Sequence, residues 1–205
     1  MNLPNKITLT RIFMIPVFVA VFFLDGVLPY NYMIAAIIFA VAACTDFIDG
    51  HIARSRGLVT NLGKFLDPIA DKVLVSTAML LMLAMKEQLV IYLGYKLYVV
   101  TAVCVCIIMA REVIISAFRQ IAATRGLVMA ADKLGKYKTT FQDVSIFVMI
   151  FSADIQSLWF KNTDVSWGAG FMMFGFALFI VATILTVWSG ISYVVKNKEV
   201  LKDTD

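Results

Sequence analysis

The stretch that decides the fold class is residues 32–50, YMIAAIIFAVAACTDFIDG, in which a long apolar run ends in two aspartates. A helix that crosses the hydrocarbon core of a bilayer needs about 20 mostly apolar residues. The run has about this length, so the stretch predicts a membrane-spanning helix whose last turns carry acidic side chains.

The rest of the chain has the same apolar character. Of its 205 residues, 61% are hydrophobic and 16% are charged, whereas an average soluble domain has about 45–50% apolar and about 25% charged residues. Because a spanning segment must satisfy its backbone hydrogen bonds internally, we expect an all-α integral membrane protein. No polar linker divides the chain, so residues 1–205 are expected to form one membrane domain. The six transmembrane helices that we expect are 7–24, 32–50, 66–85, 94–121, 139–151 and 167–195.

The placement of Lys and Arg predicts the orientation, since these residues collect on the cytoplasmic side of a membrane. One side carries Lys6, Arg11, Arg54, Arg56, Lys64, Arg119, Arg125, Lys133, Lys136, Lys138, Lys196, Lys198 and Lys202. The other side carries Lys86, Lys96 and Lys161, with Tyr92, Tyr95, Trp159 and Trp167 near the helix ends, as in an interfacial aromatic belt. We therefore expect a multi-pass protein of the cytoplasmic membrane with both termini in the cytoplasm. The net charge of +4 is modest, and the expected surroundings are membrane lipids rather than nucleic acid.

Four aspartates lie at the facing ends of the segments 32–50 and 66–85. Asp46 and Asp49 are one helical turn apart, and so are Asp67 and Asp71, so each pair shares one helix face. A short connection makes the two segments antiparallel neighbours, which lets the two faces meet. Four carboxylates brought together repel unless cations lie between them, and hard oxygen ligands suit Mg²⁺ or Mn²⁺. The pattern predicts a divalent-metal site at the cytoplasmic ends of these two helices.

Three further residues on the same faces favour a phosphate-bearing ligand beside the metals. Gly50 and Gly63 lack side chains, so a bulky ligand can approach the backbone closely. Arg54 carries a guanidinium that can bind a phosphate through two parallel hydrogen bonds.

The complete motif is Asp46-Phe-Ile-Asp49-Gly50-His-Ile-Ala53-Arg54, then eight residues, then Gly63-Lys-Phe-Leu-Asp67-Pro-Ile-Ala-Asp71. It resembles the signature of the CDP-alcohol phosphatidyltransferase family at every fixed position. The opening of the chain up to Arg11, the run Arg111-Glu112-Val113 and residues 134–142 are similar to the members that make phosphatidylglycerophosphate. The resemblance implies an enzyme that transfers a phosphatidyl group from CDP-diacylglycerol to glycerol 3-phosphate and releases CMP.

The resemblance also implies roles for the motif residues. The four aspartates would hold two divalent cations, Mg²⁺ or Mn²⁺, that neutralise the diphosphate of the CDP-lipid. Asp71 matches the general base, which takes the proton of the acceptor hydroxyl. Members of the family form homodimers, and we expect the same here. The positions expected to bind the CDP-lipid are Gly50, Ala53, Arg54, Thr60 and Gly63.

The acceptor is argued from basic residues. Arg111, Arg119, Lys136 and Lys138 lie inside the fourth and fifth segments or at their cytoplasmic ends, and a basic pocket there suits an acceptor that carries its own phosphate. Other readings stay open: Arg111 pairs with Glu112 or Asp143, and the two lysines serve membrane topology alone. Two polar residues near these lysines, Thr139 and Gln142, are interpreted as helix caps.

Three other functions compete with this one. The same chemistry serves serine, an inositol phosphate or, in cardiolipin synthesis, phosphatidylglycerol as the acceptor. An intramembrane prenyltransferase also uses aspartates to hold Mg²⁺ against a diphosphate, but its two motifs normally lie far apart in a longer chain. A transporter would spread polar residues across the membrane, whereas these carboxylates gather at cytoplasmic helix ends.

Overall fold

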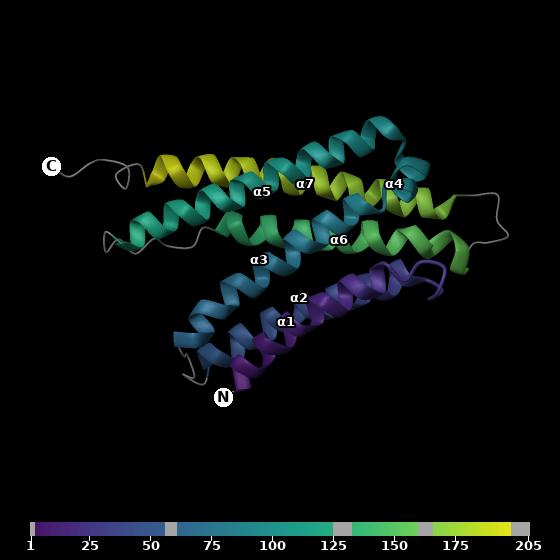
Figure 1. Ribbon diagram of the computed structural model, residues 1–205. Helices are drawn as coiled ribbons and strands as arrows, with labels where there is room; N and C mark the ends of the chain where they lie inside the picture. Colours follow the sequence, from purple (N-terminus) through teal and green to yellow (C-terminus); the bar gives the residue numbers. More distant parts are fainter. Residues whose placement is uncertain (1–2, 56–60, 125–132, 160–165, 198–205) are drawn as a thin grey trace.

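The computed structural model describes residues 3–55, 61–124, 133–159 and 166–197, and these residues form helices and turns without a strand. The all-α prediction is therefore confirmed for the described part of the chain. Figure 1 shows the arrangement of the helices. Their bounds are α1 Leu3–Phe22, α2 Asn31–Ser55, α3 Asn61–Ala84, α4 Lys86–Leu93, α5 Tyr95–Thr124, α6 Lys133–Trp159 and α7 Trp167–Lys196.

Two helices, α4 and α6, differ most from the six predicted segments. The short helix α4 lies between the predicted segments 66–85 and 94–121, where a connection was expected, and it bends away from α3 by 66°. It buries Leu89 and Leu93, one turn apart, while Lys86 and Glu87 stay exposed. The helix α6 extends well beyond the predicted 139–151 at both ends, because hydropathy marks the apolar middle of a helix and misses its polar first and last turns.

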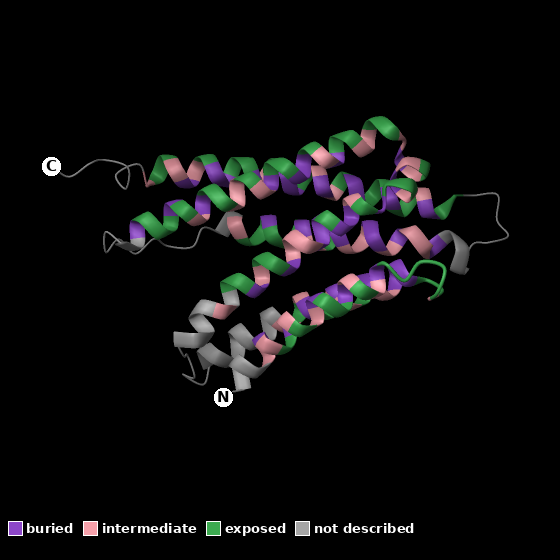
Figure 2. Ribbon diagram, viewed as in Figure 1, coloured by how far each residue is buried: buried purple, intermediate pink, exposed green. Residues whose placement is uncertain are grey.

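Within the described residues, two helices are long and apolar enough to cross a membrane on their own: Tyr95–Ala122 in α5 and Trp167–Lys196 in α7. The bent pair Pro68–Ala84 and Lys86–Leu93 counts as a third span if it is taken as one, and Ile7–Phe22 and Asn31–Thr45 are shorter apolar helices. Figure 2 shows that α5 and α7 alternate between buried and exposed faces. The exposed faces are themselves apolar, with Val103, Ile114, Ile184 and Ile191 among their residues, which suits contact with lipid rather than water.

The helices are arranged so that the predicted functional ends lie together. In Figure 1, α1 and α2 form a pair along the bottom, α5, α6 and α7 lie above it, and α3 runs between the two groups. At the left of that view α2, α5 and α7 end, and α1, α3 and α6 begin. The aspartates and the basic residues therefore come from the same end of the bundle.

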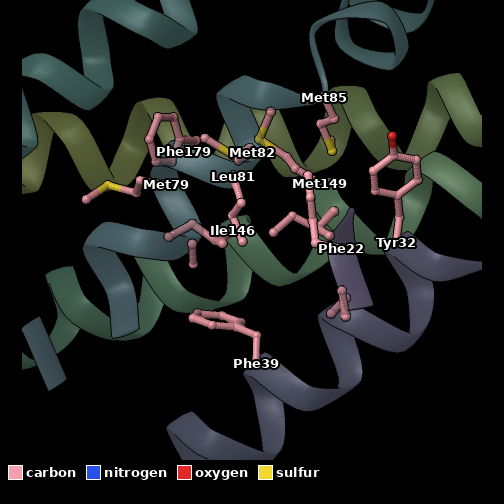
Figure 3. Close-up of a cluster of buried hydrophobic side chains, with 14 of the residues drawn as sticks. Phe22, Tyr32, Phe39, Met79, Leu81, Met82, Met85, Ile146, Met149 and Phe179 are labelled. Carbon is pink, nitrogen blue, oxygen red and sulfur yellow. The ribbon is translucent and has the colours of Figure 1, made fainter. Parts of the chain in front are cut away.

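The core contains several buried side chains of α3. Met79 and Met82 of α3 are fully buried in one cluster with Met149 of α6, Phe39 of α2 and Phe179 of α7 (Figure 3). Flexible methionine side chains fill irregular gaps between helices. This packing fixes α3 in the bundle, and Asp71 lies two turns before Met79 on the same helix face.

The most extensive helix pair is α6 with α7. Small buried residues recur at every seventh position of α7: Gly168, Gly175, Ala182 and Ser189. A Cβ atom added at Gly175 would lie 2.7 Å from Cγ of Met149, so the missing side chain lets the two backbones approach closely. The spacing of seven residues keeps this stripe of small residues on one face of α7, toward the neighbouring helices, over the length of the helix.

At the opposite end of the bundle, polar side chains form hydrogen bonds with backbone groups at the ends of helices. The amide Nδ2 of Asn31 donates to the carbonyl oxygen of Phe22 at 2.7 Å and ties the start of α2 to the end of α1. The carboxylate of Asp154, from α6, accepts the N–H of Met33 at 3.0 Å. Because the first N–H groups of a helix have no partner in the helix itself, this contact caps α2 from another part of the chain.

Candidate active site

The four aspartates of the motif lie on two helices with the spacing that the sequence predicted. Asp46 and Asp49 belong to the last turns of α2, and Asp67 and Asp71 to the first turns of α3. Asp71 is the one whose side chain the structure describes, and it is half-buried. Thr60 lies outside the described residues, as do the side-chain surroundings of Asp46, Asp49, Gly50, Ala53, Arg54, Gly63 and Asp67.

The donor set of these helix ends fits hard divalent cations, because carboxylate oxygens are the ligands that Mg²⁺ and Mn²⁺ prefer. Among the described side chains, no group of three or more potential metal ligands comes together. Asp71 alone of the four expected ligands belongs to that set, so the predicted roles of the aspartates remain predictions.

A cavity of about 330 Å³ opens beside Asp71. It is formed by α3, α5, α6 and α7, and all four basic residues that the sequence singled out line it. Counting Lys72 as well, five basic and two acidic side chains surround this basic cavity. Such a surplus of positive charge suits an anion. The lining residues are Pro68, Asp71, Lys72, Arg111, Glu112, Arg119, Gly135, Lys136, Lys138, Thr139, Ser189 and Tyr193.

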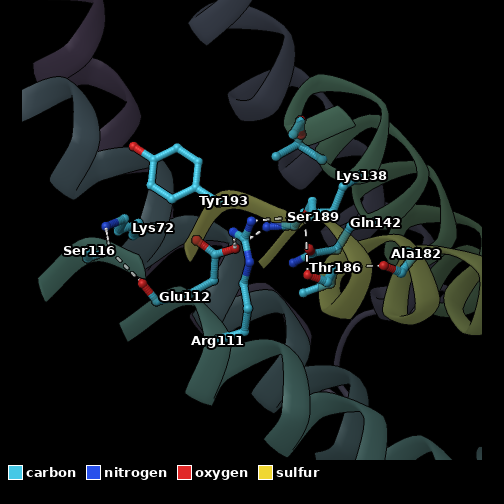
Figure 4. A network of polar contacts seen from close by, with 12 residues as sticks. Lys72, Arg111, Glu112, Ser116, Lys138, Gln142, Ala182, Thr186, Ser189 and Tyr193 are labelled. Carbon is cyan, nitrogen blue, oxygen red and sulfur yellow. Dashed lines mark hydrogen bonds and ion pairs between the residues drawn. The ribbon is translucent and has the colours of Figure 1, made fainter. Parts of the chain in front are cut away.

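Glu112 organises the middle of the basic cavity. Its Oε1 accepts a hydrogen bond from Nη1 of Arg111 at 3.1 Å and another from Nζ of Lys138 (Figure 4). Lys138 is only 3% exposed, and a charge buried this far needs a partner of opposite sign. The pairing of Arg111 with Glu112 was one of the open readings, and the structure contains it. Sequence analysis considered Glu112 as a partner of Arg111 but not of Lys138.

Lys72 is held by a hydroxyl rather than by a carboxylate. Its Nζ donates to Oγ of Ser116, and that hydroxyl donates to the backbone oxygen of Glu112 at 2.5 Å (Figure 4). The contact joins α3 to α5 immediately beside Asp71.

A second cavity, of about 400 Å³, adjoins the first and shares Asp71, Lys72, Glu112, Lys138 and Thr139 with it. Apolar side chains form much of its wall, and we call it the apolar cavity. They are Val75 and Met79 of α3 and Met109, Val113 and Ala117 of α5.

The helix-cap interpretation of two residues in this wall is wrong. Because α6 begins at Lys133, Thr139 and Gln142 lie inside the helix rather than at its start. The hydroxyl of Thr139 donates to the backbone oxygen of Lys136 at 2.9 Å. Gln142 is 3% exposed and its Nε2 donates to Sδ of Met79 at 3.6 Å, while its Oε1 has no partner among the described residues.

Arg11 is a buried cation that sequence analysis counted toward topology and the family resemblance but not toward the site. It is 1% exposed in α1, and its Nε donates to Oγ1 of Thr45 at 3.4 Å. Thr45 directly precedes Asp46, so α1 brings a guanidinium to the start of the aspartate motif. The cost of an ionised side chain within an apolar helix could have drawn attention to it.

Comparison with known proteins agrees with the motif. The sequence pattern of the CDP-alcohol phosphatidyltransferases matches residues 1–192. A Bacillus subtilis protein named CDP-diacylglycerol–glycerol-3-phosphate 3-phosphatidyltransferase is 36% identical over all of this chain and 99% of its own length. Proteins of the same name from Escherichia coli K12 and Salmonella typhimurium are 40% and 39% identical, each over 94% of this chain and 92% of their own length. The chain belongs to the CDP-alcohol phosphatidyltransferase family.

Proposed function

We propose that this protein transfers the phosphatidyl group of CDP-diacylglycerol to glycerol 3-phosphate, giving phosphatidylglycerophosphate and CMP. One observation carries the choice of acceptor: four basic side chains from α5 and α6 line one cavity with Asp71. An acceptor with its own phosphate would place that dianion among them, with its hydroxyl toward Asp71. The names of the relatives support the same acceptor.

The chemistry follows from this placement. The acceptor hydroxyl oxygen attacks the phosphorus that bears the diacylglycerol, the bond from that phosphorus to the CMP oxygen breaks, and Asp71 takes the hydroxyl proton. Two divalent cations bound by Asp46, Asp49, Asp67 and Asp71 would neutralise the diphosphate and the developing charge on the leaving group. Gly50, Ala53, Arg54, Thr60 and Gly63 would hold the CDP portion, and Arg111, Arg119, Lys136 and Lys138 the acceptor phosphate. Positioning of this kind supplies much of the rate in phosphoryl transfer.

The acceptor is tested by CMP release from purified protein in detergent, with CDP-diacylglycerol and Mg²⁺ or Mn²⁺ and one acceptor at a time. We expect release with glycerol 3-phosphate and little with serine, an inositol phosphate or phosphatidylglycerol. Release with serine alone would keep the aspartate chemistry and contradict the phosphate acceptor. Omitting the divalent cation is expected to stop release in every case.

The proposal includes a place in the cytoplasmic membrane, with six spans and both termini inside. Two clear spans, the bent pair of α3 and α4 and the apolar parts of α1 and α2 support it, as does the common end at which α1 begins and α7 ends. In a cysteine-free background, an impermeant thiol reagent is expected to reach Lys86→Cys in intact cells and Lys196→Cys only after permeabilisation. Labelling of Lys196→Cys in intact cells would contradict this orientation.

The expected homodimer is also part of the proposal. Light scattering of the protein in detergent, corrected for bound detergent, measures the mass of the assembly. A mass of one chain at working concentrations would contradict the dimer.

A further inference from the structure

We propose that the last turns of α7 position both arginines of the basic cavity, through Ser189, Gly190 and Tyr193. This inference rests on the proposed function, because the arginines are expected to bind the acceptor phosphate. The region of α7 carries no recognisable motif in the sequence, and nothing in the family signature points to it. The three residues act on the arginines rather than on the reacting atoms.

Ser189 and Gly190 shape the site of Arg111. Oγ of Ser189 accepts a hydrogen bond from Nη2 of Arg111 at 2.9 Å (Figure 4). A Cβ atom added at Gly190 would lie 3.1 Å from Cγ and 3.2 Å from Nε of the same arginine. The side chain of Arg111 therefore lies directly against the backbone of α7, in a space that a larger residue would narrow.

Tyr193 holds Arg119 in two ways. Its hydroxyl accepts a hydrogen bond from Nε of Arg119 at 3.2 Å, and its ring lies 5.2 Å from the guanidinium carbon. These contacts are a hydrogen bond through Nε and a cation–π contact with the tyrosine ring. They leave the two Nη groups for a bidentate interaction with a phosphate, since the hydrogen bonds of Arg119 within the described part of the chain go to Tyr193 alone.

Tyr193 is itself fixed by packing. It is 4% exposed and forms a small cluster with Ile115, Phe118 and Ala122 of α5, in which its ring meets that of Phe118 edge to face. The cluster packs the C-terminal part of α5 against α7. The exposed Arg119 thus gains a rigid support, which lowers the conformational entropy that it loses when it binds an anion.

The test is a double-mutant cycle between Tyr193→Phe and Arg119→Ala, read as the KM for glycerol 3-phosphate and for CDP-diacylglycerol. Phenylalanine keeps the ring in its cluster and removes only the hydroxyl acceptor. We expect Arg119→Ala to raise the KM for glycerol 3-phosphate about tenfold or more, and Tyr193→Phe to raise it about threefold to tenfold. The KM for the CDP-lipid and kcat are expected to change little. In the double variant the KM should equal that of Arg119→Ala alone within about twofold.

Two further variants sharpen the cycle. Ser189→Ala is expected to raise the KM for glycerol 3-phosphate in the wild type and to add nothing to Arg111→Ala. Thr186→Val is the matched control, because its buried hydroxyl donates to the backbone oxygen of Ala182 in its own helix, and we expect an unchanged KM. A full effect of Tyr193→Phe in the Arg119→Ala background, or no effect in the wild type, would overturn the positioning role.

A binding measurement separates this inference from the proposed acceptor. Inorganic phosphate is expected to raise the melting temperature of the wild-type protein in detergent, with a Kd that Tyr193→Phe weakens only when Arg119 is present. If no CMP is released with glycerol 3-phosphate but this cycle holds, the acceptor is wrong and the positioning role stands. If CMP is released with glycerol 3-phosphate but the effects of Tyr193→Phe and Arg119→Ala on the Kd for phosphate are additive, the positioning role is refuted and the proposed acceptor stands.

Discussion

Replacement of Asp71 by asparagine is expected to lower the kcat for CMP release by about 10³-fold, within the range of 10²–10⁴ that a general base contributes. The amide keeps the shape of the carboxylate and one oxygen that can bind a metal, but it cannot take a proton. Binding of CDP-diacylglycerol should therefore remain largely intact. The measurement is CMP release under saturating substrate, together with the thermal stabilisation that the CDP-lipid produces in detergent.

The matched control for this variant is Asp143→Asn. Asp143 is half-buried and lines the apolar cavity with Asp71, so the control removes one carboxylate from the same surroundings without touching the proposed base. We expect close to wild-type turnover from it. Near-normal activity of Asp71→Asn would refute the assignment of the base, and equal losses in both variants would point to the charge of the cavity instead.

The fold could be predicted from the sequence wherever a helix is apolar along most of its length. The segments 94–121 and 167–195 correspond closely to α5 and α7. The short helix α4 could not be predicted, because its end with Lys86 and Glu87 looks like a polar connection. Hydropathy also found only the middle of α6, since Lys133 and Asp154 lie in helical turns whose polarity suggested a loop.

The site divides in a similar way. Several residues with an unusual charge for their position were found from the sequence, and of these Arg111, Lys136 and Lys138 line one cavity, whereas the buried Arg11 was missed. The residues that hold them were missed. Ser189 and Tyr193 are ordinary members of an apolar helix by composition, and only the packing of α7 against α5 brings them to the arginines.

Glu112 shows why a list of basic residues is an incomplete description of the basic cavity. Its carboxylate accepts hydrogen bonds from both Arg111 and Lys138, so part of their charge is compensated before any ligand arrives. The carboxylate offsets the repulsion between these two like charges and holds both cations in place. If a phosphate binds in this cavity as proposed, it lies beside this carboxylate, and the cations that do not pair with Glu112, such as Arg119, contribute more to its affinity.

Replacement of Asp49 by asparagine is expected to abolish the metal-dependent part of CDP-diacylglycerol binding, and turnover with it. Asp49 lies in the last turns of α2, one turn after Asp46, where the proposal places metals between α2 and α3. Loss of one carboxylate leaves a site with fewer hard ligands and less negative charge, and both changes weaken divalent-cation binding.

The measurement for Asp49→Asn is the stabilisation of the protein by the CDP-lipid across a titration of Mg²⁺ or Mn²⁺. The wild type should show a saturable metal requirement, and the variant little stabilisation at any concentration tested. Asp25→Asn is the control, because Asp25 is exposed in the turn before the opposite end of α2 and should leave the titration unchanged. An unaltered metal requirement in Asp49→Asn would contradict the two-metal site. If the variant reached full stabilisation at a higher metal concentration, Asp49 would bind only one weakly held ion. The contrast with Asp71→Asn is the decisive part, because the proposal predicts lost binding for one aspartate and retained binding without turnover for the other.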